Sequence, residues 1–165
     1  SFPNIGDKGQ ITVISQPGLR YAQAKALVNS LLLDAAFNNL SLTARNNVLE
    51  RILSEIKGRM MEDIVLLETM LANPKKEVFK LQFAVGEIDM VVFDPEALSC
   101  KIYEIKHSTE IAEQQYRYLV DTDKCKDIEF RFGTITERTV IYRGENANLE
   151  NGVKYQNVEE YLSIL

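Results

Sequence analysis

The sequence predicts a mixed α/β fold, with a central β-sheet flanked by helices. Three strand-like runs rich in β-branched and aromatic residues follow one another between residues 77 and 107. A long amphipathic helical pattern precedes these runs, and a further helical pattern with two short strand-like runs follows them. Hairpin strands followed by a crossover helix are typical of a sheet that mixes antiparallel and parallel pairs.

The chain before the sheet is predicted to hold one short strand and two helices. Residues 11–14 form an apolar run typical of a strand, and apolar residues three and four apart predict a helix over residues 19–37. The same spacing predicts a second helix over residues 44–72, which Pro74 brings to an end. Gly58 interrupts this second helix, where it costs about 1 kcal/mol relative to alanine and marks a kink, a break or a close backbone contact.

The three central strands are predicted to form a meander over residues 77–83, 87–93 and 101–107. Residues 85–86 leave room only for a tight turn, and residues 94–96 make the second turn. Strands joined by such short connections pair antiparallel. This part of the chain is therefore the antiparallel half of the sheet.

The rest of the chain is predicted to alternate helix and strand. A helix is expected over residues 109–120, followed by strands over residues 128–132 and 140–143. Residues 146–152 are mostly polar and include a glycine, which is typical of a loop. Residues 158–165 are expected to form a closing helix.

The composition is that of an ordinary globular domain. A chain of 165 residues that is 45% apolar and 26% charged suits a single folded unit with its own core. No apolar run is long enough to span a membrane, and the N-terminus lacks a signal-peptide pattern. Cys100 and Cys125 have neither metal-ligand spacing nor a disulfide framework, so a reduced, cytoplasmic setting is expected.

Charge and motifs narrow the possible functions further. The net charge of −5 excludes a wholly basic nucleic-acid binder but is compatible with a nuclease whose carboxylates hold a cation. The chain begins at Ser1 rather than methionine, and we expect it to be part of a longer protein. No GxxxxGK[ST] phosphate-binding loop occurs in the sequence, so ATP is not bound by that route.

Charged residues stand inside two of the predicted strands, where apolar residues are normal. Asp89 lies within an apolar run, and Glu104 and Lys106 lie two apart in the next strand, so these two point to the same face. Burying a carboxylate costs several kcal/mol unless it is paired, protonated or bound to a metal. If the strands pair as a hairpin, the three side chains meet as a site for one hard divalent cation and an activated water.

The same three residues have a simpler explanation, which stays open on the pattern alone. Glu104 and Lys106 can form an ion pair on a solvated sheet face, with Asp89 at the surface of an alternating strand. The E-x-K triplet is a weak signal by itself. Asp89 in the preceding strand and an acidic residue on the upstream helix strengthen it.

Four stretches together resemble the PD-(D/E)xK nuclease superfamily. The resemblance is strongest to the nuclease-like domain that follows an AAA-type P-loop ATPase in many prokaryotic proteins. The stretches are residues 58–68 with Gly58-x-x-x-Glu62, residues 86–93 with Gly-Glu-Ile-Asp89, residues 103–106 with Glu104-x-Lys106, and the pair Gln114-Gln115. The match covers residues 44–143, and Ile88 stands where the superfamily often has proline.

The resemblance implies a restriction-endonuclease-like fold, with a central mixed β-sheet flanked by helices, and a role for each matched residue. The implied catalytic set is Glu62, Asp89, Glu104, Lys106 and Gln115. Asp89 and Glu104 would bind Mg²⁺ or Mn²⁺, and Glu62 would complete the ligand set from the helix. Lys106 would be the catalytic lysine, and Gln115, in preference to Gln114, would support the site.

The function implied by the resemblance is a Mg²⁺-dependent DNA phosphodiesterase domain within a larger ATPase protein. Residues 1–43 would be a segment of strand and helix that leads from the missing ATPase domain, and residues 44–165 would form the nuclease-like domain. The alternative is a catalytically inactive module of the same fold that docks the ATPase or binds nucleic acid or protein.

Overall fold

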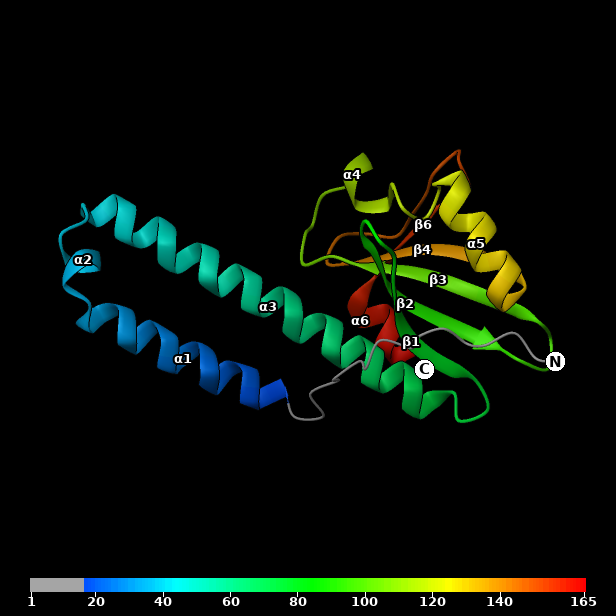
Figure 1. Cartoon of the computed structure of the whole chain (residues 1–165), viewed down its shortest axis with the longest axis horizontal. Helices are drawn as coiled ribbons and strands as arrows, with labels where there is room; N and C mark the ends of the chain where they lie inside the picture. The colour runs from blue at the N-terminus through cyan, green and yellow to red at the C-terminus, as the bar shows by residue number, and fades with distance from the viewer. Residues whose placement is uncertain (1–16) are drawn as a thin grey trace.

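The computed structural model describes residues 17–165 and confirms a mixed α/β fold with a sheet flanked by helices (Figure 1). The helices of this range are α1 (Pro17–Leu33), α2 (Ala35–Asn38), α3 (Leu42–Ala72), α4 (Glu113–Tyr116), α5 (Thr122–Phe132) and α6 (Val158–Ser163). The strands are β1 (Glu77–Gln82), β2 (Glu87–Asp94), β3 (Ser99–Ile105), β4 (Thr134–Tyr142), β5 (Ala147–Asn148) and β6 (Lys154–Asn157). They form one sheet in the order β1-β2-β3-β4-β6-β5.

The sheet combines an antiparallel meander with a parallel half. β1, β2 and β3 pair antiparallel, as the short turns between them predicted. β3 pairs parallel with β4, and β4 pairs parallel with β6. A parallel pair needs a long crossover, and the connection from β3 to β4 accordingly carries α4 and α5.

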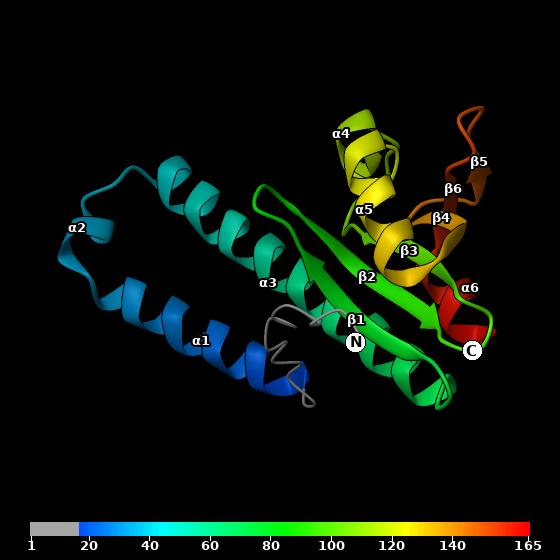
Figure 2. The ribbon, with the colours of Figure 1, turned by 45° about the vertical axis from the view of Figure 1, so that its right-hand side comes forward.

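The two faces of the sheet pack against different helices. Met90 and Val92 of β2 lie in a core shared with α3 and α6, whereas Val91 between them lies in the core shared with α5. This alternation follows from the period of two along a strand. Figure 2 shows α3 and α5 on opposite sides of the strands.

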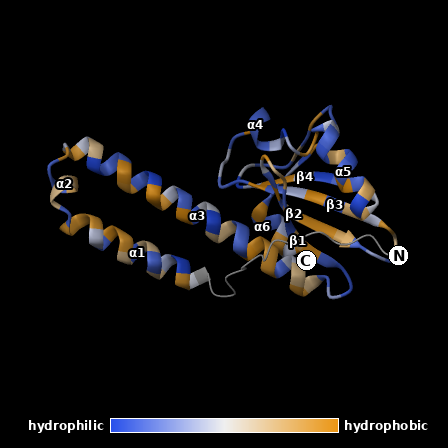
Figure 3. Ribbon diagram, viewed as in Figure 1, coloured by the Kyte–Doolittle hydropathy of each residue, from blue (hydrophilic) through white to orange (hydrophobic). Residues whose placement is uncertain are grey.

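α1 and the first half of α3 form an antiparallel hairpin that projects beyond the sheet (Figures 1 and 2). Ser41 caps α3, since the Ala44 backbone N–H donates to its hydroxyl at 3.2 Å. Arg20 of α1 donates to Asp63 of α3, with Nη2 to Oδ1 at 3.2 Å. Figure 3 shows apolar residues along this hairpin, but no helix within residues 17–165 is long and apolar enough to cross a membrane.

The prediction of a strand over residues 128–132 is wrong, because these residues end α5. Ile128, Phe130 and Phe132 recur every second residue, which imitates a strand. The burial is helical instead: Cys125 and Ile128, three apart, are buried, while Phe130 is 87% exposed. The alternation in the sequence therefore does not reflect alternation between a core and solvent.

Three other predictions need adjustment. The helix expected over residues 109–120 shrinks to α4, and α5 starts separately because Asp121 caps it by accepting from the backbone N–H groups of Asp123 and Lys124. β5 lies within the predicted loop, and β6 follows that loop in a stretch for which no strand was predicted. The strand expected over residues 11–14 lies outside the described residues.

α3 continues without a break through Gly58, at the point where it passes the end of β3. A methyl group added there would meet the His107 Cβ at 3.8 Å, which is ordinary van der Waals contact. We therefore expect Gly58→Ala to raise the free energy of unfolding by up to about 1 kcal/mol through helix propensity. Urea unfolding checks this, and a lowered midpoint would show that α3 needs closer backbone contact here than the structure has.

Candidate functional site

Asp89 and Glu104 lie side by side on β2 and β3 and are almost completely buried. The antiparallel register begins with Met90 of β2 opposite Tyr103 of β3, and Asp89 and Glu104 adjoin this pair at the same end of the two strands. The Lys106 ammonium group contacts both carboxylates, so the two side chains are neighbours. Their exposed fractions are only 4% and 3%, which contradicts a solvated sheet face.

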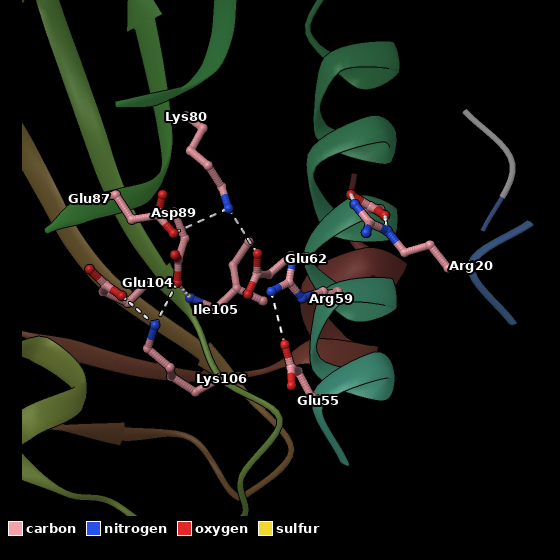
Figure 4. Close-up of polar contacts among 11 residues, drawn as sticks. Arg20, Glu55, Arg59, Glu62, Lys80, Glu87, Asp89, Glu104, Ile105 and Lys106 are labelled. Atoms are coloured by element: carbon pink, nitrogen blue, oxygen red, sulfur yellow. Dashed lines mark hydrogen bonds and ion pairs between the residues drawn. The ribbon is translucent and has the colours of Figure 1, made fainter. Parts of the chain in front are cut away.

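Lys106 lies between these two carboxylates (Figure 4). Its Nζ is 2.7 Å from Asp89 Oδ2 and 2.5 Å from Glu104 Oε2. Asp89 Oδ2 also accepts the Ile105 backbone N–H at 2.8 Å, which fixes the carboxylate against β3. Because Glu104 and Lys106 are two residues apart at the end of β3, their side chains point to the same face, and the Lys106 ammonium group contacts the Glu104 carboxylate.

Glu62 reaches this region from α3, on the side away from Glu104 (Figure 4). Its carboxylate binds Lys80 of β1, with Nζ to Oε2 at 2.9 Å, and Lys80 also lies 3.5 Å from Glu87 of β2. Burial raises the pKa of Glu62. The negative charge of Asp89 raises it further, so the Asp89 carboxylate influences the pair of Glu62 and Lys80. The structure therefore brings Asp89, Glu104 and Lys106 into direct contact, whereas Glu62 pairs with Lys80 and is linked to Asp89 by the effect of that charge on its pKa.

Burial has a large effect on protonation in the site. It raises the pKa of Glu104 to about 8, and the negative charge of Asp89 acts in the same direction against the opposing charge of Lys106. Burial also lowers the pKa of Lys106, but Asp89 and Glu104 outweigh it and leave that pKa above its ordinary value. Lys106 consequently stays charged, and Glu104 binds a proton more readily than an ordinary glutamate.

The chemistry of these groups fits a hard divalent cation. Glu104 Oε1 is buried and, within the described residues, has no hydrogen-bond partner, which leaves a desolvated oxygen directed at no donor. Counting Glu62, Glu87, Asp89 and Glu104 against Lys80 and Lys106, the fully ionised cluster carries two excess negative charges. Carboxylate oxygens are the ligands that Mg²⁺ and Mn²⁺ prefer.

The ligand set is not gathered around one point in this conformation. Within residues 17–165, no three His, Cys, Asp or Glu side chains form a group that could hold a metal ion. Lys106 takes the position between Asp89 and Glu104, and Lys80 binds Glu62. Two of the three predicted metal ligands therefore share a cation already, and the third is paired elsewhere.

Gln115 lies beyond this charged cluster, on α4. Its amide oxygen accepts the Tyr155 hydroxyl at 3.0 Å and the Ala112 backbone N–H at 3.2 Å. Burial raises the pKa of Tyr155, and the charge of Lys106 opposes that rise. The contacts of Gln115 thus make it a support for Tyr155.

Lys80 and Glu87 are members of the cluster that the sequence analysis missed. Lys80 is a charged residue inside the apolar run of β1, two positions after Val78. A charged residue inside a predicted strand is also the feature that distinguished Asp89 and Glu104. Neither a protein-family model nor a curated protein matches this sequence, and the site rests on the geometry of the chain itself.

The raised pKa of Glu104 makes a prediction about stability and pH. Between about pH 4.5, the ordinary pKa, and about pH 8, the unfolded chain releases this proton while the folded chain keeps it. Glu104 therefore makes the free energy of unfolding fall as pH rises through this window. Glu104→Gln should flatten that fall, as measured by urea unfolding at several pH values in EDTA. An unchanged slope in the variant would show that Glu104 titrates normally.

Proposed function

We propose that this chain is a Mg²⁺-dependent DNA phosphodiesterase domain with a restriction-endonuclease-like fold. The observation that carries the proposal is the pair of buried carboxylates, Asp89 and Glu104, that share the ammonium group of Lys106. Two buried acids on neighbouring strands are costly for stability alone. A requirement for a cation at this point gives a reason for keeping both.

The residues that would hold Mg²⁺ or Mn²⁺ are Asp89 and Glu104, with Glu62 added from α3. When bound there, the cation would lower the pKa of a water molecule and neutralise charge that develops on a phosphodiester. Glu104 would have to release the proton that burial favours. Cation binding should therefore release protons at neutral pH and strengthen as pH rises toward 8.

Lys106 would act as a hydrogen-bond donor in this mechanism. Its raised pKa keeps the ammonium group protonated, so it is unsuited to accept a proton from water. A charged donor can stabilise an oxygen on which negative charge increases in the transition state. Its hydrogen bonds to Asp89 and Glu104 hold it beside the carboxylates that would bind the cation.

The ion pairs also favour a second candidate function, the catalytically inactive module. Lys106 and Lys80 neutralise much of the carboxylate charge without any metal, and Glu62 with Lys80 fastens α3 to β1. In that case the charged cluster serves to hold α3 on the sheet through polar contacts. The domain would then dock an ATPase or bind nucleic acid or protein.

We place either function in a larger protein, with DNA as the substrate and an AAA-type ATPase as the neighbouring domain. What supports the ATPase is the resemblance of the four motif stretches. We also propose a cytoplasmic setting, since Cys100 and Cys125 are both free and buried. Burial raises the pKa of Cys100 to about 11, so that thiol is not a reactive thiolate.

The nuclease proposal predicts stabilisation by a divalent cation. Mn²⁺ at about 100 times its Kd should raise the free energy of unfolding by about 2.7 kcal/mol. Asp89→Ala should abolish both this stabilisation and the cleavage of plasmid DNA, as thermal melting and gel assays would show. Glu68→Ala is the control, because it removes an exposed acid from α3 outside the cluster. Unchanged metal binding and nicking in Asp89→Ala would refute the assignment.

Replacement of the lysine separates the two candidate functions. Lys106→Met removes the ammonium group that competes for Asp89 and Glu104, so the melting-temperature shift produced by Mn²⁺ should persist or grow. Without metal, the variant should lose about 3–5 kcal/mol, because two buried carboxylates lose their counter-ion. Cleavage should fall about 10²- to 10³-fold.

Lys126→Met, at an exposed position of α5, should change none of the three measurements. If Lys106→Met destabilises the chain but Mn²⁺ stabilises neither it nor the parent, the cluster is structural and the inactive module is the correct function.

A further inference from the structure

A cleft of about 370 Å³ opens near the acidic cluster, between α3, α6 and the ends of β3 and β4. Its lining combines two kinds of side chain. The apolar residues include Met60, Met61 and Leu162, and the basic residues are Lys57, His107 and Arg143. Neither the metal ligands nor Lys106 line it.

Two of the three basic side chains of this cleft lie within hydrogen-bond distance of each other. Arg143 Nη1 lies 3.4 Å from His107 Nε2. Burial lowers the pKa of His107, and the charges of Arg143 and Lys57 lower it further, so the three groups are close enough to interact. Among residues 17–165, neither Lys57 nor Arg143 forms an ion pair with a carboxylate.

The cleft carries a small excess of positive charge in an acidic chain. The net charge of the chain is −5, and the acidic residue that lines the cleft is Glu159, at the start of α6. Lys57 and Arg143 therefore exceed it by one charge in a space that apolar side chains also line. Both basic side chains are exposed, so an anion can reach them from solvent.

The cleft and the acidic cluster share the end of β3 and the same stretch of α3. His107 follows Lys106 with its side chain on the other face of the strand, and Met61 precedes Glu62 on α3, so the cleft opens on the α3 side of the cluster. The strand ends are held together, since Lys106 N–H donates to Ile141 O at 2.9 Å and Arg143 N–H donates to Ser108 O at 2.8 Å. The distance from cleft to cluster is thus fixed by backbone hydrogen bonds.

We propose that Lys57, His107 and Arg143 bind a phosphate of the DNA backbone on the α3 side of the phosphate being cleaved. The inference rests on the proposed function and names the positioning residues for its substrate. Arg and Lys are the usual partners of backbone phosphates, and such contacts set the register of DNA without reading its sequence. The guanidinium group suits two phosphate oxygens at once.

The test is DNA binding measured separately from cleavage. Arg143→Gln and Lys57→Gln are introduced into the chain with Asp89→Ala, and fluorescence anisotropy follows a labelled duplex in EDTA, where no cleavage occurs. Each change should weaken binding about 10-fold and reduce the slope of log affinity against log salt by about 1. Lys126→Gln removes an exposed charge from α5, on the opposite face of the sheet, and should leave affinity and slope unchanged.

The possible outcomes separate this inference from the nuclease proposal. Unchanged affinity in both Arg143→Gln and Lys57→Gln overturns the phosphate site, even if Asp89 proves essential for cleavage. Weakened binding in a chain that never cleaves DNA supports the phosphate site and refutes the nuclease. A melting temperature equal to that of the parent shows that the variants fold.

Inorganic phosphate distinguishes a backbone site from a site for a small anion. The probe is the His107 ring, whose NMR resonances report on the cleft directly. Duplex DNA should shift these resonances in the Asp89→Ala chain, and Arg143→Gln should weaken that response about 10-fold. If millimolar phosphate shifts them and duplex DNA does not, the cleft binds a free anion and the proposal is wrong.

Discussion

The burial of Asp89 and Glu104 is the constraint on which this end of the molecule depends. Two carboxylates on adjacent strands are removed from water, and an unpaired buried charge costs several kcal/mol. Lys106 offsets part of that cost by contacting both, and the raised pKa of Glu104 favours its neutral form. The sheet thus keeps its charged residues through ion pairing and protonation together.

The same constraint links α3 to the sheet. α3 packs apolar side chains on one face of the strands, but its polar contact with β1 is the pair of Glu62 and Lys80. Because the charge of Asp89 raises the pKa of Glu62, a change of charge at Asp89 alters the protonation of Glu62 on α3. A cation at Asp89 would therefore strengthen the ionised form of Glu62, which is the form that can join it as a ligand.

Local patterns predicted the parts of the fold that are local. α3, the three strands of the meander and α6 each carry an apolar period and end at a turn or cap, so the sequence alone located them. β6 has only Tyr155 buried, and it forms because it pairs parallel with β4, a pairing that its own short sequence does not indicate. The strand predicted over residues 128–132 was wrong because Ile128, Phe130 and Phe132 alternate as in a strand, whereas the buried residues Cys125 and Ile128 follow a helical spacing of three.

In the candidate site, too, some contacts follow from local sequence patterns and others depend on tertiary packing. The contact of Asp89, Glu104 and Lys106 followed from strand alternation and a hairpin, both of which are local rules. Lys80 could not be placed without the packing of α3, and Gln115 turns to Tyr155 because β6 joins the sheet there. The cluster has two excess negative charges when fully ionised; a proton on Glu104 would remove one of them in the free protein, and a divalent cation would offset both on the nuclease hypothesis. Proton release is therefore the step that connects the energetics of burial with the proposed activity.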